Sequence, residues 1–156
     1  MRMKNFEVAR ILRNISILLD MDDAPFKPRA YEKAALSIEA LEEDVEQIYQ
    51  KGGLKALKQI PGVGESIAEK IEEIIKTGKL EYYEELSKKA PVDLESLSGI
   101  EGLGPKKIKV LWQKLKIKNI EGLEKAASSH EISKLPGFKK KNYRRTKENR
   151  APEKVT

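Results

Sequence analysis

The chain has 156 residues, of which 39% are hydrophobic and 36% charged, a balance typical of one or two small globular domains. The lack of cysteine excludes disulfides and thiolate metal sites, and the single histidine, His130, excludes a histidine-rich metal cluster. No apolar run approaches the roughly 20 residues that cross a bilayer, and the first residues do not resemble a signal peptide. We therefore expect an intracellular, cytoplasmic protein without a membrane partner.

The net charge of +6 is concentrated at the end of the chain. Residues 139–156 include eight basic and two acidic side chains, so residues 1–138 together are close to neutral. This segment has almost no apolar residues and is predicted to be a disordered basic tail; a truncated gene product and a reading-frame slip in the lysine run are the alternatives. Nucleic-acid binding by the folded part then needs a cause other than bulk charge.

Apolar residues recur at helical spacing through most of the chain, and no stretch shows sustained alternation of apolar and polar residues. The predicted fold class is therefore all-α, in compact helical domains. Asp44 is expected to cap one helix, and Gly78 is expected to end another. The pattern predicts helices over residues 8–19, 27–41, 45–49, 54–59, 65–77 and 80–90.

The sequence contains an internal repeat. "LKQIPGVGESIAEKI" at 57–71 aligns with "LSGIEGLGPKKIKVL" at 97–111, and "ISKLPGFKKK" at 132–141 is a weaker third copy. Each copy combines a short helix, an isoleucine or leucine, a glycine-containing kink and a second helix. The third copy has Lys139 where the second glycine is expected.

The kink of the first copy lies directly before a helix, where backbone N–H groups lack intrahelical partners and the helix dipole attracts anions. Gly62 and Gly64 can adopt positive φ and carry no side chain. A phosphate oxygen can therefore approach the N–H groups around Gly62, Gly64 and Ser66. Val63 is expected to turn inward and tie the kink to the core. Such a site binds the DNA backbone without base specificity.

The second copy has the same glycines, Gly102 and Gly104, followed by Lys106 and Lys107, whose charges favour an anion at that helix start. The alternative is an ordinary helical turn, in which the glycines only end one helix and begin the next. For one copy, the two interpretations are about equally good. The repetition of the whole pattern favours phosphate binding.

These segments resemble the helix-hairpin-helix motif, and their order resembles the amino-terminal region of family X DNA polymerases. The resemblance rests on "FKPRAYEKAALSI" at 26–38, "IPGVGESIAEKIEEIIKTGKL" at 60–80 and "IEGLGPKKIKVLW" at 100–112. It implies a lyase-type domain with the first hairpin at 1–90 and a subdomain with the second and a partial third hairpin at 91–138. The polymerase palm does not follow Lys141, so this chain alone is not expected to polymerise nucleotides.

The resemblance implies non-sequence-specific DNA binding by a monomer, at gaps or nicks during repair. Two further functions stay open: a 5′-deoxyribose-phosphate lyase and a binding module without chemistry. A helical scaffold for protein interactions is the third alternative. Salt-dependent DNA affinity separates the scaffold from the other two.

Lys70 lies at the border of the apolar stripe on its predicted helix. A lysine at such a border can be partly desolvated, which leaves more neutral amine for attack on an aldehyde carbon. A lysine that extends to water is the commoner case at this position. The resemblance implies that Lys70 is the Schiff-base lysine, which attacks C1′ of an incised abasic site.

The same resemblance places Lys27 and Tyr31 in the lyase pocket, although Tyr31 also has the spacing of a core residue. Lyase-active members of the family carry lysine at the positions of Ser66 and Tyr82 and histidine at the position of Phe26. A pocket with fewer cations is expected to bind a 5′-phosphate less well.

The family also binds a monovalent cation, Na⁺ or K⁺, through backbone carbonyls of its hairpins. The resemblance implies that the ligands here are the carbonyl oxygens of Lys58, Ile60, Val63, Ser98, Ile100 and Leu103.

Overall fold

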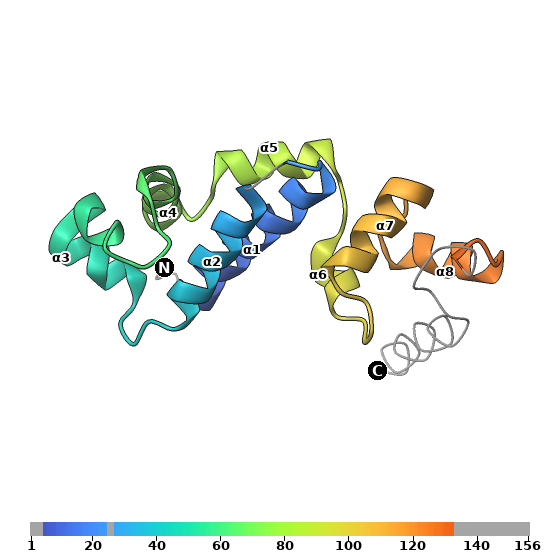
Figure 1. Ribbon diagram of the computed structural model, residues 1–156, viewed down its shortest axis with the longest axis horizontal. Coiled ribbons are helices and arrows are strands. Elements are labelled where there is room, and N and C mark those ends of the chain that lie inside the picture. Colours follow the sequence, from blue (N-terminus) through green and yellow to red (C-terminus); the bar gives the residue numbers. More distant parts are fainter. Residues whose placement is uncertain (1–4, 25–26, 133–156) are drawn as a thin grey trace. The chain divides into compact units, whose positions relative to one another are not determined.

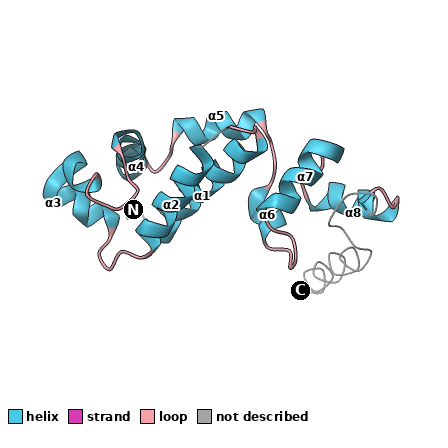
Figure 2. Cartoon of the chain, viewed as in Figure 1, coloured by secondary structure: helices cyan, strands magenta, loops and turns pink. Residues whose placement is uncertain are grey.

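The computed structural model describes residues 5–24 and 27–132, and over these residues it shows helices and loops but no strand (Figure 1 and Figure 2). The predicted all-α fold class is confirmed. No helix in the described part of the chain is long and apolar enough to cross a membrane. The helices are α1 (Asn5–Met21), α2 (Lys27–Glu39), α3 (Val45–Leu57), α4 (Glu65–Thr77), α5 (Glu81–Lys89), α6 (Leu94–Ser98), α7 (Pro105–Leu115) and α8 (Ile120–Ser128).

The chain divides into two compact units between Ala90 and Pro91, with α1–α5 in the first and α6–α8 in the second. Three features predicted from the sequence, the basic tail, most of the third repeat and the side chain of Phe26, lie outside the described residues.

The first unit is built on α1 and α2, which pack side by side (Figure 1). The small side chains of Ala34 and Ala35 let the two helix backbones approach closely, while larger side chains of α1 fill the space between them. Each larger apolar side chain buried here stabilises the fold by about 1.5–3 kcal/mol. The fully buried residues of this pair include Val8, Ala9, Leu12, Ile15, Ala34, Ala35 and Ile38.

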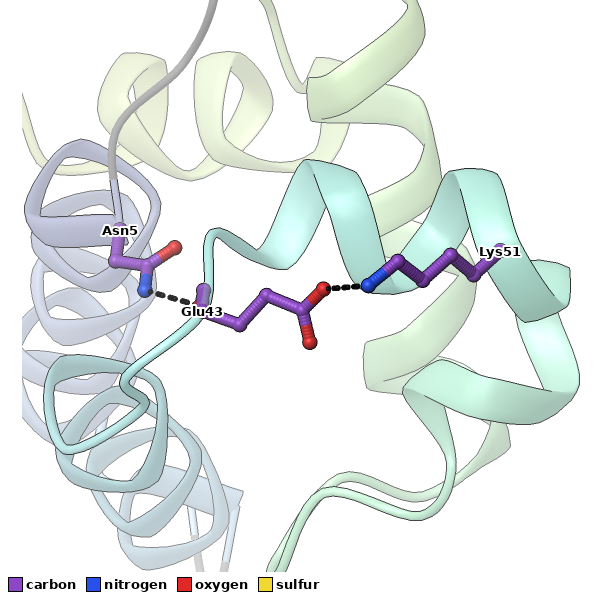
Figure 3. A network of polar contacts seen from close by, with 3 residues as sticks. All are labelled: Asn5, Glu43 and Lys51. Atoms are coloured by element: carbon purple, nitrogen blue, oxygen red, sulfur yellow. Dashed lines mark hydrogen bonds and ion pairs between the residues drawn. The ribbon is translucent and has the colours of Figure 1, made fainter.

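Asn5 at the start of α1 holds the start of α3 (Figure 3). Its Nδ2 donates to the backbone oxygen of Glu43 at 2.9 Å, and its Oδ1 accepts from the N–H of Val45 at 2.7 Å. Nζ of Lys51 donates to Oε1 of the same Glu43 at 2.6 Å. Asp44 takes the N-cap position but makes no side-chain capping hydrogen bond. The amide of a distant helix thus replaces the cap predicted from the sequence.

Glycines with positive φ interrupt or end two helices of this unit. Gly53 breaks α3 with φ of 64° and ψ of −155°, so the short helix predicted after it is the last turn of α3. Gly78 ends α4 as predicted, in the left-handed conformation, and its N–H donates to the carbonyl of Ile74 at 2.8 Å.

The second unit has its own core, formed by α6, α7, α8 and the loops between them. Side-chain oxygens cap two of its helices: Oδ1 of Asp93 accepts from the N–H of Ser96 at 3.2 Å, and Oδ1 of Asn119 accepts from the N–H of Gly122 at 2.8 Å. The fully buried residues of this core include Leu97, Ile108, Leu111 and Ile132.

Candidate functional site

The two glycine kinks have the same backbone geometry. The first glycine of each, Gly62 and Gly102, has φ of 82° and 83°. The second, Gly64 and Gly104, is extended, with φ of −89° and −93°. The internal repeat is thus a repeat of structure. The sequence allows positive φ at both glycines of the first kink, and it occurs only at Gly62, because Gly64 is the N-cap residue of α4 and N-caps have extended backbones.

The same hydrogen bond closes both kinks. The N–H of Val63 donates to the carbonyl of Ile60 at 3.0 Å, and the N–H of Leu103 donates to the carbonyl of Ile100 at 3.1 Å. Val63 is buried, as predicted, so it anchors the first kink to the core. Each kink is thus a hydrogen-bonded turn that directly precedes a helix, α4 in the first unit and α7 in the second.

Open space lies in front of both helix starts. A Cβ added at Gly64 or Gly104 would meet nothing within 4 Å. At Gly62, by contrast, a Cβ would lie 3.0 Å from Cγ of Lys33, in a backbone conformation that strains any side chain. Packing and backbone angles therefore account for glycine at position 62, whereas positions 64 and 104 leave the backbone accessible to a ligand.

A pocket of about 480 Å³ opens at the start of α4. It brings together the side chains from α2 and α4 that sequence analysis selected, together with the first glycine kink. Tyr82 of α5 adds an aromatic ring. From the sequence, this position was noted only because lyase-active members of the family carry lysine there. The residues that line the pocket include Lys27, Tyr31, Gly62, Gly64, Glu65, Ser66, Lys70 and Tyr82.

Two contacts hold Lys70 in this pocket. Its Nζ donates to Oγ of Ser66 at 2.9 Å and lies 4.8 Å from the centre of the Tyr82 ring, within cation–π range. The Lys70 side chain is half-buried beside the apolar stripe of α4, where the buried residues include Ile67 and Ile71. The ammonium group therefore has a defined position at the pocket wall.

Tyr31 and Tyr82 form the aromatic side of the pocket. Their rings are stacked, with centroids 6.3 Å apart and planes 22° apart. Burial, followed by repulsion from Tyr82 once that residue ionises, raises the pKa of Tyr31 to about 12, and a hydrogen bond with Ser66 partly opposes this. Burial also raises the pKa of Tyr82. Both hydroxyls therefore stay neutral at physiological pH.

The raised pKa of Tyr31 predicts a loss of stability in alkali. The pKa of this side chain is 10.0 in the unfolded state and about 12 in the folded state. Between these pH values the folded state binds more protons than the unfolded state, so the folded state loses stability as the pH rises. Between about pH 9 and pH 12, we expect the free energy of unfolding to fall by about 1–2 kcal/mol more in wild type than in the Tyr31→Phe variant. Urea unfolding followed by circular dichroism measures this; equal losses in both proteins contradict it.

The start of α7 differs from the start of α4 in its charge. Lys106 is exposed and Lys107 is half-buried in the first turn of α7. Between Glu101 and Glu121 the sequence has six lysines and no acidic residue. One of these, Lys116, places its Nζ 4.8 Å from the centre of the Trp112 ring. The second hairpin is therefore the more cationic of the two.

The carbonyl oxygens of Ile60 and Ile100 each accept one hydrogen bond within their kink and keep a second lone pair for another partner. The monovalent-cation site that the resemblance implies at these carbonyls stays a prediction. Within residues 5–24 and 27–132, no group of three or more His, Cys, Asp or Glu could hold a metal ion.

Comparisons with known proteins agree with this geometry. A family model described as "Helix-hairpin-helix domain" matches residues 3–80, and one described as "SAM-like Helix-hairpin-helix tandem" matches residues 94–146. The chain is 33% identical over 137 residues to the DNA polymerase/3′-5′ exonuclease PolX of Bacillus subtilis (strain 168). This match covers 87% of the chain and 23% of the relative, so the chain spans about a quarter of that protein. The predicted resemblance to family X DNA polymerases is confirmed.

Proposed function

Because the chain belongs to the helix-hairpin-helix domain family, we propose that it binds DNA through backbone phosphates, without sequence specificity, at gaps or nicks during repair. The observation that carries this proposal is the repeated kink, which leaves open space in front of two helix starts. The relative named as a DNA polymerase supports DNA as the ligand.

The kinks can bind phosphate through backbone N–H groups, which do not require a net positive charge on the folded part of the chain. Backbone N–H groups at a helix start point outward, and the helix dipole adds a partial positive charge there. A phosphate oxygen at such a position accepts charge-assisted hydrogen bonds, each worth about 1.5–3 kcal/mol. Because these donors belong to the backbone and bind only phosphate, they orient the protein on DNA without reading bases.

The double variant Gly64→Ala, Gly104→Ala tests the role of the kinks. Both positions are extended and have room for a Cβ, so the cost in stability is about 0.5 kcal/mol per site, from the poorer N-cap. The added methyl groups occupy the space that phosphate must enter. We expect affinity for a gapped duplex, measured by fluorescence anisotropy, to fall about tenfold.

The matched control is Gly99→Ala, since Gly99 has helical backbone angles and its added Cβ would make ordinary contacts, the nearest at 3.5 Å from the carbonyl oxygen of Ser96. We expect this control to bind DNA as wild type does. If the double variant is folded, as circular dichroism shows, and binds gapped DNA as tightly as wild type, the kinks are not the phosphate sites.

A second candidate function, 5′-deoxyribose-phosphate lyase activity, is favoured by the placement of Lys70 in a pocket beside a helix start. In this reaction, neutral Nζ attacks C1′ of the open sugar and water leaves as the imine forms. Loss of a C2′ proton then expels the 3′-phosphate, and water hydrolyses the imine to restore the amine. Tyr31 and Lys27 would contact the sugar and its 5′-phosphate from α2.

A further inference from the structure

The two hairpins share one backbone geometry but carry opposite charges at their helix starts. Glu65 is the first residue of α4, at the position that Pro105 takes in α7. The next position is Ser66 in the first hairpin and Lys106 in the second. A carboxylate therefore stands at one helix start, and lysines stand at the other.

Glu65 lies at the mouth of the candidate phosphate site. It lines the same pocket as Gly62 and Gly64, and 72% of its side chain is exposed. Its Oε1 lies 3.5 Å from Nζ of Lys58, the residue that follows α3. This ion pair spans the kink and links the end of α3 to the start of α4.

A carboxylate in the first turn of a helix interacts favourably with the positive end of the helix dipole. It therefore neutralises part of the positive potential that attracts phosphate. Its negative charge also repels a second anion nearby. Lys58 would partly offset this repulsion, but its ammonium group is already directed to the carboxylate. The start of α7 has no acidic side chain in its first turn and instead carries Lys106 and Lys107.

We propose that Glu65, paired with Lys58, acts as an internal competitor of phosphate and makes the first hairpin the weaker of the two DNA contacts. The second hairpin then supplies most of the affinity for DNA. This inference rests on the proposed function, since it concerns the strength of the same phosphate sites.

The test compares Glu65→Gln with Glu84→Gln by fluorescence anisotropy on a labelled gapped duplex at low and physiological salt. Glu84 is an exposed residue in the first turn of α5, outside the pocket, so both variants make the same change in net charge. We expect Glu65→Gln to bind about threefold to tenfold more tightly than wild type, and Glu84→Gln to change by less than about twofold.

Equal changes in the two variants, or no gain from Glu65→Gln, would overturn the inference, because the effect would then be one of net charge alone or absent. These results are distinct from a failure of the proposed function. That function fails if wild type shows no salt-dependent affinity for the duplex, whereas the present inference fails when wild type binds and removal of the carboxylate brings no specific gain.

Discussion

Replacing Lys106 and Lys107 together by glutamine is expected to weaken binding to a gapped duplex by about tenfold to a hundredfold at physiological salt. Both lysines lie in the first turn of α7, beside the open space in front of Gly104. Each phosphate that loses a cationic partner keeps its condensed counterion. The slope of log affinity against log salt should therefore become shallower by about 2.

A loss of folding does not explain such a result. Lysines at the start of a helix oppose the helix dipole, so their replacement by glutamine should leave α7 as stable as before or slightly more stable. We expect the thermal unfolding transition, followed by circular dichroism, to stay at or slightly above its wild-type temperature. Weaker binding with undiminished stability is the expected signature of a contact residue.

The matched control is Lys88→Gln, Lys89→Gln, an adjacent pair of exposed lysines in the last turn of α5. It makes the same change in net charge at residues that belong to neither kink and do not line the pocket at the start of α4. We expect its affinity to fall by less than about threefold. If this control loses as much affinity as the α7 variant, DNA binding depends on overall charge, and the second hairpin has no special role.

The second large effect is expected at Lys70 under the lyase alternative. Incubation of wild type with incised abasic DNA and sodium borohydride should give a covalent adduct, because hydride reduces the transient imine to a stable amine. Lys70→Ala should give no adduct while it still binds gapped DNA, since the phosphate contacts come from backbone N–H groups. Adduct formation is measured by denaturing gel electrophoresis with labelled DNA.

Lys76→Ala is the control, because Lys76 is an exposed lysine of the same helix, 3.9 Å from the carboxylate of Glu72. It should form the adduct as wild type does. The Ser66→Lys variant should raise the yield, since a second cation improves contact with the 5′-phosphate. No wild-type adduct at saturating DNA would leave the protein as a binding module without lyase chemistry.

The sequence by itself determined the helical fold and the repeat. Apolar residues at helical spacing define α4 and Gly78 marks its end, so the predicted span of residues 65–77 agrees with the helix observed. Helix periodicity and glycine signals are local properties of the sequence, so they can be recognised without knowing what the helix packs against. The two kinks were recognisable for the same reason, because their short pattern of glycines and apolar residues recurs at residues 97–111.

Only the tertiary structure decided which side chains from other segments contact the helix starts and Lys70. Asn5 caps α3 from a distant segment, Tyr82 covers Lys70 from α5, and Lys58 pairs with Glu65 across the kink. The sequence also left open which glycine of each kink has positive φ, since either can adopt it. These features depend on how separate helices are brought together, because a hydrogen bond or ion pair forms only at contact distance. Helical spacing shows which face of a helix is apolar but not which neighbour lies against its end.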